Sequence, residues 1–147
     1  MLDFLSKTDI EKVKNKISEI ENSSSGEVVI SIRRKRNFFE RKKSIFQLAS
    51  EEFRRANVAN TIDSTGVLIF ILLSEKKLYI LPDNNIIKVV PDNFWQNLAD
   101  EMSEKFKTRK FVDGLLDCIE KIGEVMKNHF PKKQEDVNEL PDDIRIN

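Results

Sequence analysis

The segment Gly66–Leu73 (GVLIFILL) is the feature that most restricts how this chain can fold. It is apolar without interruption, yet much shorter than the ~20 residues that a membrane-spanning helix needs. A strand of this kind is covered on both faces, as at the centre of an α/β sheet, because a solvated face would place polar residues at alternate positions. We therefore expect a sheet centred on this segment, with helices packed on both of its faces.

Apolar residues at helical spacing predict four helices, and runs of β-branched residues predict further strands. The first expected helix begins at Thr8, where Thr8 and Glu11 have the spacing of a capping box. The second covers Arg41 to Ala56, with Phe46 facing inward. The third opens at Pro91, with Asp92 as N-cap, and the fourth runs from Lys110 to His129. The expected strands are Glu27–Arg33, Gly66–Leu73 and Leu78–Leu81, while Ile86–Val90 is either a short strand or an extended connection.

This order of elements predicts the α/β class: a three-layer α/β/α sandwich with a central mixed sheet of about four strands. The first two strands, joined through a helix, should be parallel with a right-handed crossover, and the next strand antiparallel. At 147 residues the chain is expected to be a single domain, 1–147, with a core over about 5–130. Residues 131–147 would form an extended acidic closing segment, held on the sandwich by Val137, Leu140, Ile144 and Ile146.

Charge and cysteine content argue against several classes of protein. The 25 basic and 25 acidic residues balance, so we expect no sequence-specific nucleic-acid binding. Cys118 is the single cysteine, which fits a reducing compartment, and it is predicted as a small buried hydrophobe. The N-terminus contains acids and no small-residue cleavage site, so we expect no signal peptide, no transmembrane segment and a cytoplasmic protein. His129, the single histidine, is predicted to cap a helix end.

Five stretches stand out in order along the chain: SSGEVVISI, STGVLIFILLSEKKLYIL, VPDNFW, DGLLDCIEKIG and HFP...DVNELPDDI. Together they resemble the TPM domain family, named after thylakoid, phosphatase and MOLO proteins. The likeness covers nearly the whole chain and is greatest to short, stand-alone bacterial members that end in an NELPD-type segment. The resemblance also implies an α/β/α sandwich.

The resemblance implies two kinds of function. One is a small binding or accessory module, serving in stress response or membrane-protein maintenance, with an unknown protein or a membrane-associated partner. The alternative is a phosphatase that depends on a divalent cation, Ca²⁺ or Mg²⁺. Such an enzyme needs a nucleophile or an activated water beside the cation. No complete set of such residues can be identified in the sequence, so the catalytic residues stay unassigned.

A metal site would need several oxygen ligands, and Asp63, Asp83 and Asp92 are the candidates. Their spacing matches no compact loop motif such as an EF-hand. The structural alternatives are a turn residue for Asp63 and an N-cap for Asp92. The chain also departs from its relatives here, because Pro82-Asp83-Asn84-Asn85 keeps the acid of a Gly-Asp-x-Gly segment and loses both glycines.

The loop 33–43 (RRKRNFFERKK) holds seven Lys or Arg residues against the single acid Glu40. Family members of the type that the chain resembles usually have an acidic loop here. Ligands of open α/β sheets favour the carboxyl ends of parallel strands. We therefore predict an anion-binding site in which guanidinium groups take a phosphate or carboxylate, formed by Arg33, Arg34, Lys35 and Arg36. The alternative is a solvated loop whose Phe38 and Phe39 pack against the core.

Overall fold

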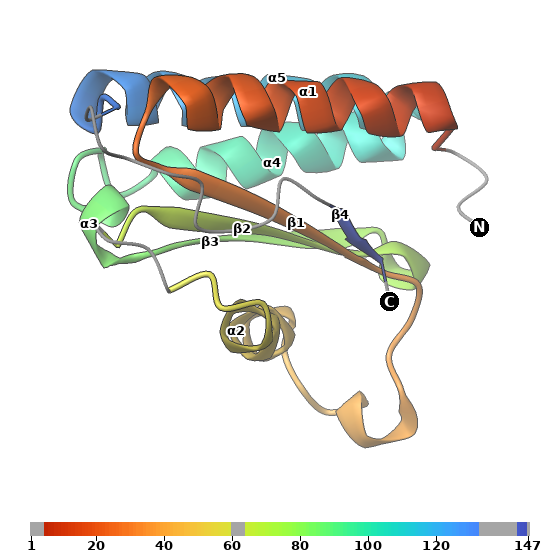
Figure 1. The fold of residues 1–147 in the computed structure, drawn as a ribbon. Helices are drawn as coiled ribbons and strands as arrows, with labels where there is room; N and C mark the ends of the chain where they lie inside the picture. Colours follow the sequence, from red (N-terminus) through yellow and green to blue (C-terminus); the bar gives the residue numbers. More distant parts are fainter. Residues whose placement is uncertain (1–4, 60–63, 133–143, 147) are drawn as a thin grey trace.

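The computed structural model of the protein describes residues 5–59, 64–132 and 144–146. Its elements are α1 (Lys7–Ser23), β1 (Glu27–Arg33), the 3-10 helix η1 (Phe38–Glu40), α2 (Ile45–Arg55), β2 (Gly66–Leu72), the 3-10 helix η2 (Leu73–Glu75), β3 (Lys77–Pro82), α3 (Asn84–Ile87), α4 (Phe94–Lys107), α5 (Phe111–His129) and β4 (Ile144–Ile146). Figure 1 shows the sheet between α1, α4 and α5 on one face and α2 on the other. The predicted α/β sandwich with helices on both faces is confirmed.

The sheet has four strands in the order β3-β2-β1-β4. β1 and β2 are parallel and in register from the pair Glu27 and Gly66 to the pair Arg33 and Leu72. β3 runs antiparallel to β2, as its short connection predicts. Since β1 and β2 end together, the segments that follow them lie at the same edge of the sheet.

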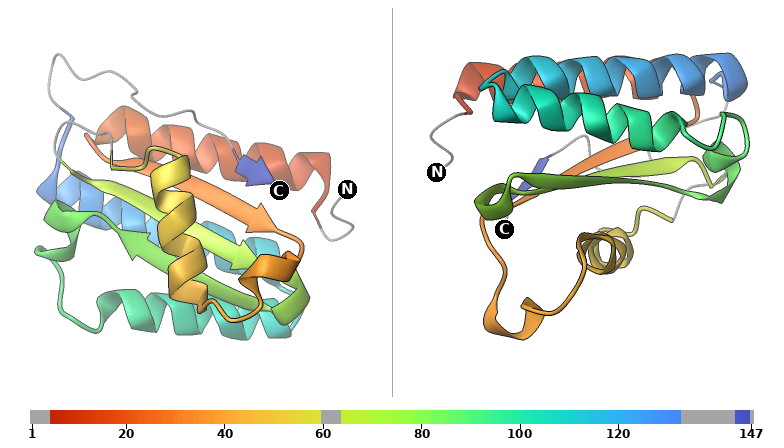
Figure 2. Two further views of the ribbon diagram at one scale, coloured as in Figure 1. Left: turned by 90° about the horizontal axis from the view of Figure 1, so that it is seen from below. Right: turned by 180° about the vertical axis from the view of Figure 1, so that it is seen from behind.

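The apolar run of β2 is covered on both faces, as expected. Successive side chains of a strand point to opposite faces, so the run divides into two sets. Val67, Ile69 and Ile71 belong to the core beneath α1, α4 and α5, whereas Leu68, Phe70 and Leu72 belong to the core beneath α2. All six are fully buried. The two views of Figure 2 show α2 crossing the strands on its face and the three long helices covering the other.

The helices α1 and α2 begin at residues other than those predicted. α1 is capped by Ser6, whose hydroxyl accepts from the Asp9 amide while the Asp9 carboxylate accepts from the Ser6 amide, both at 3.1 Å. The expected pair of Thr8 and Glu11 has the same spacing but lies inside the helix. α2 begins at Ile45, after the Ser44 cap, rather than at Arg41.

The segment predicted as a strand or extended connection after β3 is partly helical. The Asp83 side chain accepts the Asn84 amide at 2.7 Å and starts the short helix α3, which buries Ile86. Asp92 is not the N-cap of α4; Asn93 occupies that position without a side-chain hydrogen bond. The cap from Asp83, followed one turn later by the buried Ile86, explains why α3 forms. The β-branched residues of this segment had favoured a strand instead.

Three phenylalanines lie farther from the core than predicted. Phe46 is 48% exposed because α2 contacts the sheet through its neighbouring face, and its ring rests against Tyr79 at 5.4 Å. Phe38 and Phe39 are exposed as well, at 73% and 87%. The expectation that these two pack on the core is therefore wrong.

The end of the closing segment joins the sheet. β4 pairs in parallel with β1, aligning Ile144 with Ile30 and Ile146 with Ile32. The predicted contacts of Val137 and Leu140 fall outside the described residues. Among the helices that the structure describes, none combines the length and the apolar character needed to cross a membrane.

Candidate functional site at the basic edge of the sheet

The carboxyl ends of β1 and β2 define one edge of the sheet, which we call the basic edge. It comprises the loop 33–43 after β1, the turn 73–76 after β2 and the turn 107–110 between α4 and α5. The Ser74 amide donates to the Arg34 carbonyl at 2.9 Å and joins the first two of these segments. In open α/β sheets this edge is where ligands usually bind.

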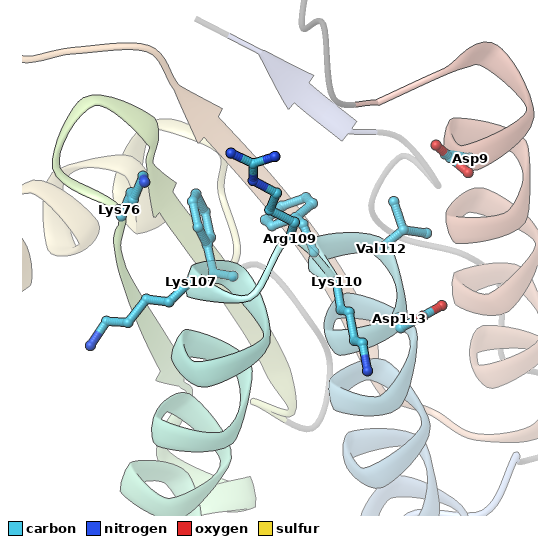
Figure 3. A pocket seen from close by; sticks show the side chains of 9 residues that line it. Asp9, Lys76, Lys107, Arg109, Lys110, Val112 and Asp113 are labelled. Carbon is cyan, nitrogen blue, oxygen red and sulfur yellow. The ribbon is translucent and has the colours of Figure 1, made fainter.

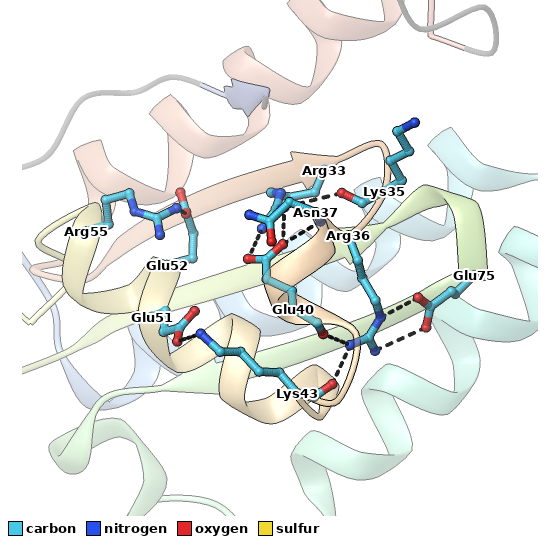
Figure 4. A network of polar contacts seen from close by, with 10 residues as sticks. All are labelled: Arg33, Lys35, Arg36, Asn37, Glu40, Lys43, Glu51, Glu52, Arg55 and Glu75. Carbon is cyan, nitrogen blue, oxygen red and sulfur yellow. Dashed lines mark hydrogen bonds and ion pairs between the residues drawn. The ribbon is translucent and has the colours of Figure 1, made fainter.

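Arg33 is bound to a carboxylate of its own chain. Its two terminal nitrogens donate to the Glu40 carboxylate at 2.6 and 3.0 Å, and the Asn37 amide donates to the same group at 2.9 Å. The side chains of Arg33 and Glu40 are only 13% and 7% exposed. The hydrogen bond from Arg33 is the main reason that the pKa of Glu40 falls to about 2. The ion pair joins the start of the loop, at Arg33, to Glu40 within it (Figure 4).

Arg36 ties the same loop to the turn after β2. Its Nε and Nη2 donate to the Glu75 carboxylate, the latter at 3.2 Å, and Nη1 donates to the backbone carbonyls of Glu40 and Lys43. The hydrogen bond from Arg36 lowers the pKa of Glu75. The loop is therefore held at two places by bidentate guanidinium–carboxylate pairs, which are the strongest kind of charged hydrogen bond.

The predicted anion-binding residues divide into two groups. Arg33, Arg34 and Lys35 line one hollow of about 450 Å³, with Arg55 of α2 opposite them. Arg36 does not line it and faces Glu75 instead. Within the hollow, the Arg33 guanidinium binds the Glu40 carboxylate, and Arg55 pairs with Glu52. Arg34 and Lys35 therefore supply its exposed cations that form no ion pair with a described residue. Anion binding by this group stays a prediction.

A larger cavity of about 570 Å³ lies at the same edge, on the side of α1, α4 and α5. Phe106, Phe111 and Val112 supply its apolar lining, and the two phenylalanine rings meet edge to face at 4.9 Å. Four cations and two acids complete it: Lys76, Lys107, Arg109, Lys110, Asp9 and Asp113. Figure 3 shows Arg109 and Lys110 on the turn between α4 and α5, with Lys76 on the separate turn beside them.

Two of these cations occupy unfavourable backbone positions. Lys76 has φ 51° and Arg109 has φ 65°, in the left-handed region that favours glycine. At Arg109 this conformation closes α4, because the Lys110 amide reaches back to the Lys105 carbonyl at 2.8 Å. Such strain is found at functional sites more often than elsewhere, which makes these two cations the principal candidates for ligand binding.

The cavity was not predicted from the sequence. Its visible signal is the run Lys107-Thr108-Arg109-Lys110, a cluster of cations between two helices. Nothing in the sequence joins that run to Lys76 or to Asp9, which come from other elements and meet it only in the folded chain.

The candidate metal ligands are not assembled in the part of the chain that the structure describes. Asp83 caps α3, Asp92 lies in the turn before α4, and Asp63 falls outside the described residues. Over residues 5–59, 64–132 and 144–146, no three His, Cys, Asp or Glu side chains come together as a metal site. The metal site therefore stays a prediction.

Cys118 and His129 occupy the structural positions that the sequence predicts for them. Cys118 is 2% exposed in the core, and burial raises the pKa of its thiol to about 12. A thiol with so high a pKa is almost entirely protonated at neutral pH and reacts poorly. Its predicted role as a buried hydrophobe is confirmed. His129 lies in the last turn of α5, as predicted.

Comparison with known proteins identifies the family. The family model for the TPM domain matches residues 2–125. Among solved structures, the BA42 protein from the psychrophilic bacterium Bizionia argentinensis is 29% identical with a TM-score of 0.86, over 100% of this chain and 98% of that one. The N-terminal domain of a P. gingivalis protein is 16% identical with a TM-score of 0.69, covering 87% and 80% of the two chains, and shows the fold alone. The search of curated proteins gave no match.

Proposed function

This chain belongs to the TPM domain family, and we propose that it is a small binding or accessory module that holds an anionic group of its partner in the cavity at the basic edge. One observation carries this proposal. Lys76 and Arg109 line the same cavity from separate turns, and both adopt a left-handed conformation that costs stability. Stress response and membrane-protein maintenance are the settings that fit such a module.

The lining of the cavity indicates the class of ligand. Four cations against two carboxylates favour a negative group, and the guanidinium of Arg109 suits the paired oxygens of a phosphate or carboxylate. Phe106, Phe111 and Val112 offer apolar surface beside those charges. We therefore infer that the ligand joins a phosphate or carboxylate to an apolar or aromatic group.

Phenyl phosphate carries both features and is the probe for this proposal. Titration followed by amide chemical shifts should move the signals of Lys76, Arg109 and Lys110. Inorganic phosphate, which lacks the ring, should bind more weakly. Arg109→Gly and Lys76→Gly should each weaken binding of phenyl phosphate about five- to tenfold, in line with the loss of one charged hydrogen bond.

The same substitutions should stabilise the fold, because glycine adopts the left-handed conformation without strain. We expect a gain of about 0.5–1 kcal/mol for each. The control is Asn57→Gly, since Asn57 has φ 57° but does not line the cavity. Phenyl phosphate binding that survives both substitutions, or that Asn57→Gly weakens equally, would refute the proposal.

The titration also addresses the phosphatase that the resemblance implies. A binding module should leave phenyl phosphate intact, with or without Mg²⁺ or Ca²⁺. Release of inorganic phosphate that requires the cation would favour the enzyme instead. A rate of release that survives Asp83→Asn and Asp63→Asn would then exclude these two acids as the catalytic metal ligands.

A further inference from the structure

Two adjacent phenylalanines stand outside the core at the tip of the loop between β1 and α2, which we call the loop tip (residues 37–42). Phe38 is 73% exposed and Phe39 is 87% exposed. Their rings meet edge to face with centroids 5.7 Å apart, and the Arg41 guanidinium lies 5.2 Å from the Phe38 ring. Figure 1 shows this turn projecting away from the sandwich, beyond α2.

The exposure is built into the structure of the loop. The Glu40 carboxylate accepts hydrogen bonds from both terminal nitrogens of Arg33. Arg36 donates to the Glu75 carboxylate, which lies 39 positions farther along the sequence. The Asn37 amide closes the turn by donating to Glu40. These contacts hold the base of the loop (Figure 4), so the two rings are presented in a fixed position instead of folding back onto apolar surface. Exposed apolar surface of this kind marks an interaction site.

The loop that carries the rings is rich in cations. Arg33, Arg36 and Lys43 are engaged by carboxylates of this chain. The remaining four basic side chains of the loop are exposed, and none forms an ion pair with another residue that the structure describes: Arg34, Lys35, Arg41 and Lys42. Internal ion pairs therefore engage three cations of the loop and leave four, of which Arg41 and Lys42 belong to the loop tip and Arg34 and Lys35 lie just before it.

We propose that the loop tip docks the protein on an anionic membrane surface, with Phe38 and Phe39 inserted among the lipid headgroups. Aromatic side chains favour that interface, and each nearby Lys or Arg adds attraction to anionic lipid. A projecting tip needs no matching pocket in a membrane, whereas a protein partner would have to supply an acidic concave one. The proposal goes beyond the anion cavity, whose lining residues are all different from those of the tip.

Sedimentation with vesicles of phosphatidylglycerol and phosphatidylcholine tests this docking. At low salt the wild-type protein should bind phosphatidylglycerol vesicles and leave pure phosphatidylcholine vesicles unbound. The double substitution Phe38→Ser and Phe39→Ser should weaken binding about tenfold or more, because the inserted apolar area is lost. Replacing Arg34, Lys35, Arg41 and Lys42 with Gln should abolish it. Ile87→Ser is the matched control, since Ile87 is 46% exposed on α3 and should have no effect.

A fluorescent side chain at the tip reports insertion directly. Phe39→Trp in a Trp95→Phe background should shift its emission to the blue on phosphatidylglycerol vesicles and be quenched by brominated lipid. Arg109→Gly should leave vesicle binding unchanged, which separates this test from that of the cavity. Vesicle binding that persists without the two phenylalanines overturns the proposal. The proposal is also overturned if the wild-type protein does not bind phosphatidylglycerol vesicles. That outcome would favour a protein partner with an acidic, concave surface for the loop tip.

Discussion

The pair of Arg33 and Glu40 makes the loop at the basic edge sensitive to acid. The Glu40 carboxylate accepts three hydrogen bonds, and its pKa falls from the usual 4.5 to about 2. A carboxyl whose pKa is lowered by folding stabilises the protein above its unfolded pKa and loses that contribution as the pH falls towards its folded pKa. The window of loss is therefore about pH 5 to pH 2.

The size of the effect follows from the same values. The difference between 4.5 and about 2 corresponds to at most about 3 kcal/mol. Solvent screens a pair at the edge of the molecule, so we expect Glu40→Gln to lower the free energy of unfolding by about 1–3 kcal/mol at pH 7. The deficit relative to the wild type should shrink as the pH is lowered from 5. The unfolded chain then binds a proton at Glu40, whereas the folded carboxylate stays ionised until the pH approaches its pKa of about 2.

Urea denaturation at a series of pH values measures both effects. The control is Glu101→Gln, which removes a carboxylate that is 57% exposed and pairs with Lys121. That substitution should cost less than about 0.5 kcal/mol at any pH. If Glu40→Gln costs no more than the control at pH 7, or if its deficit stays constant down to pH 3, the reasoning is refuted.

Three further predictions concern the core and the sheet. Gly66→Ala should cost about 1–3 kcal/mol in urea denaturation, because its Cβ would meet the backbone carbonyl of Val58, and a neutral effect would contradict this contact. Cys118 should not react with a disulfide reagent at pH 8 until urea unfolds the protein; rapid native labelling would show that the thiol is accessible. Deleting residues 132–147 should lower the melting temperature and speed amide exchange in β1, which loses its partner β4; an unchanged melting curve would contradict this.

The sequence by itself determined the layers of this fold. The apolar run that forms β2 has no polar face, so it required a cover on each side, and the helical stripes supplied both covers. The bounds of β1 were predicted without error, because β-branched residues fill it between a turn and a charged loop. Both are properties of neighbouring residues, which the sequence displays directly.

The sequence could not decide the start of α1 or the structure of the segment after β3, because two local patterns fit the same residues. Ser6 with Asp9 and Thr8 with Glu11 offer the same capping geometry, and the folded chain uses the first. The segment after β3 contains β-branched residues, yet the cap from Asp83 makes it helical. In each case two structures fit the same residues, and only packing against the remainder of the protein decides between them.

The tertiary structure alone decided the candidate sites. Apolar residues favour burial, and one interpretation of the sequence packed Phe38 and Phe39 against the core, but the contact of Arg36 with Glu75 holds their loop away from it. The cavity needs Lys76 and Arg109 to adopt left-handed conformations that neither residue type favours. Those contacts and dihedral angles depend on segments that are distant along the chain, and such segments meet only because the sheet brings the ends of its strands to one edge.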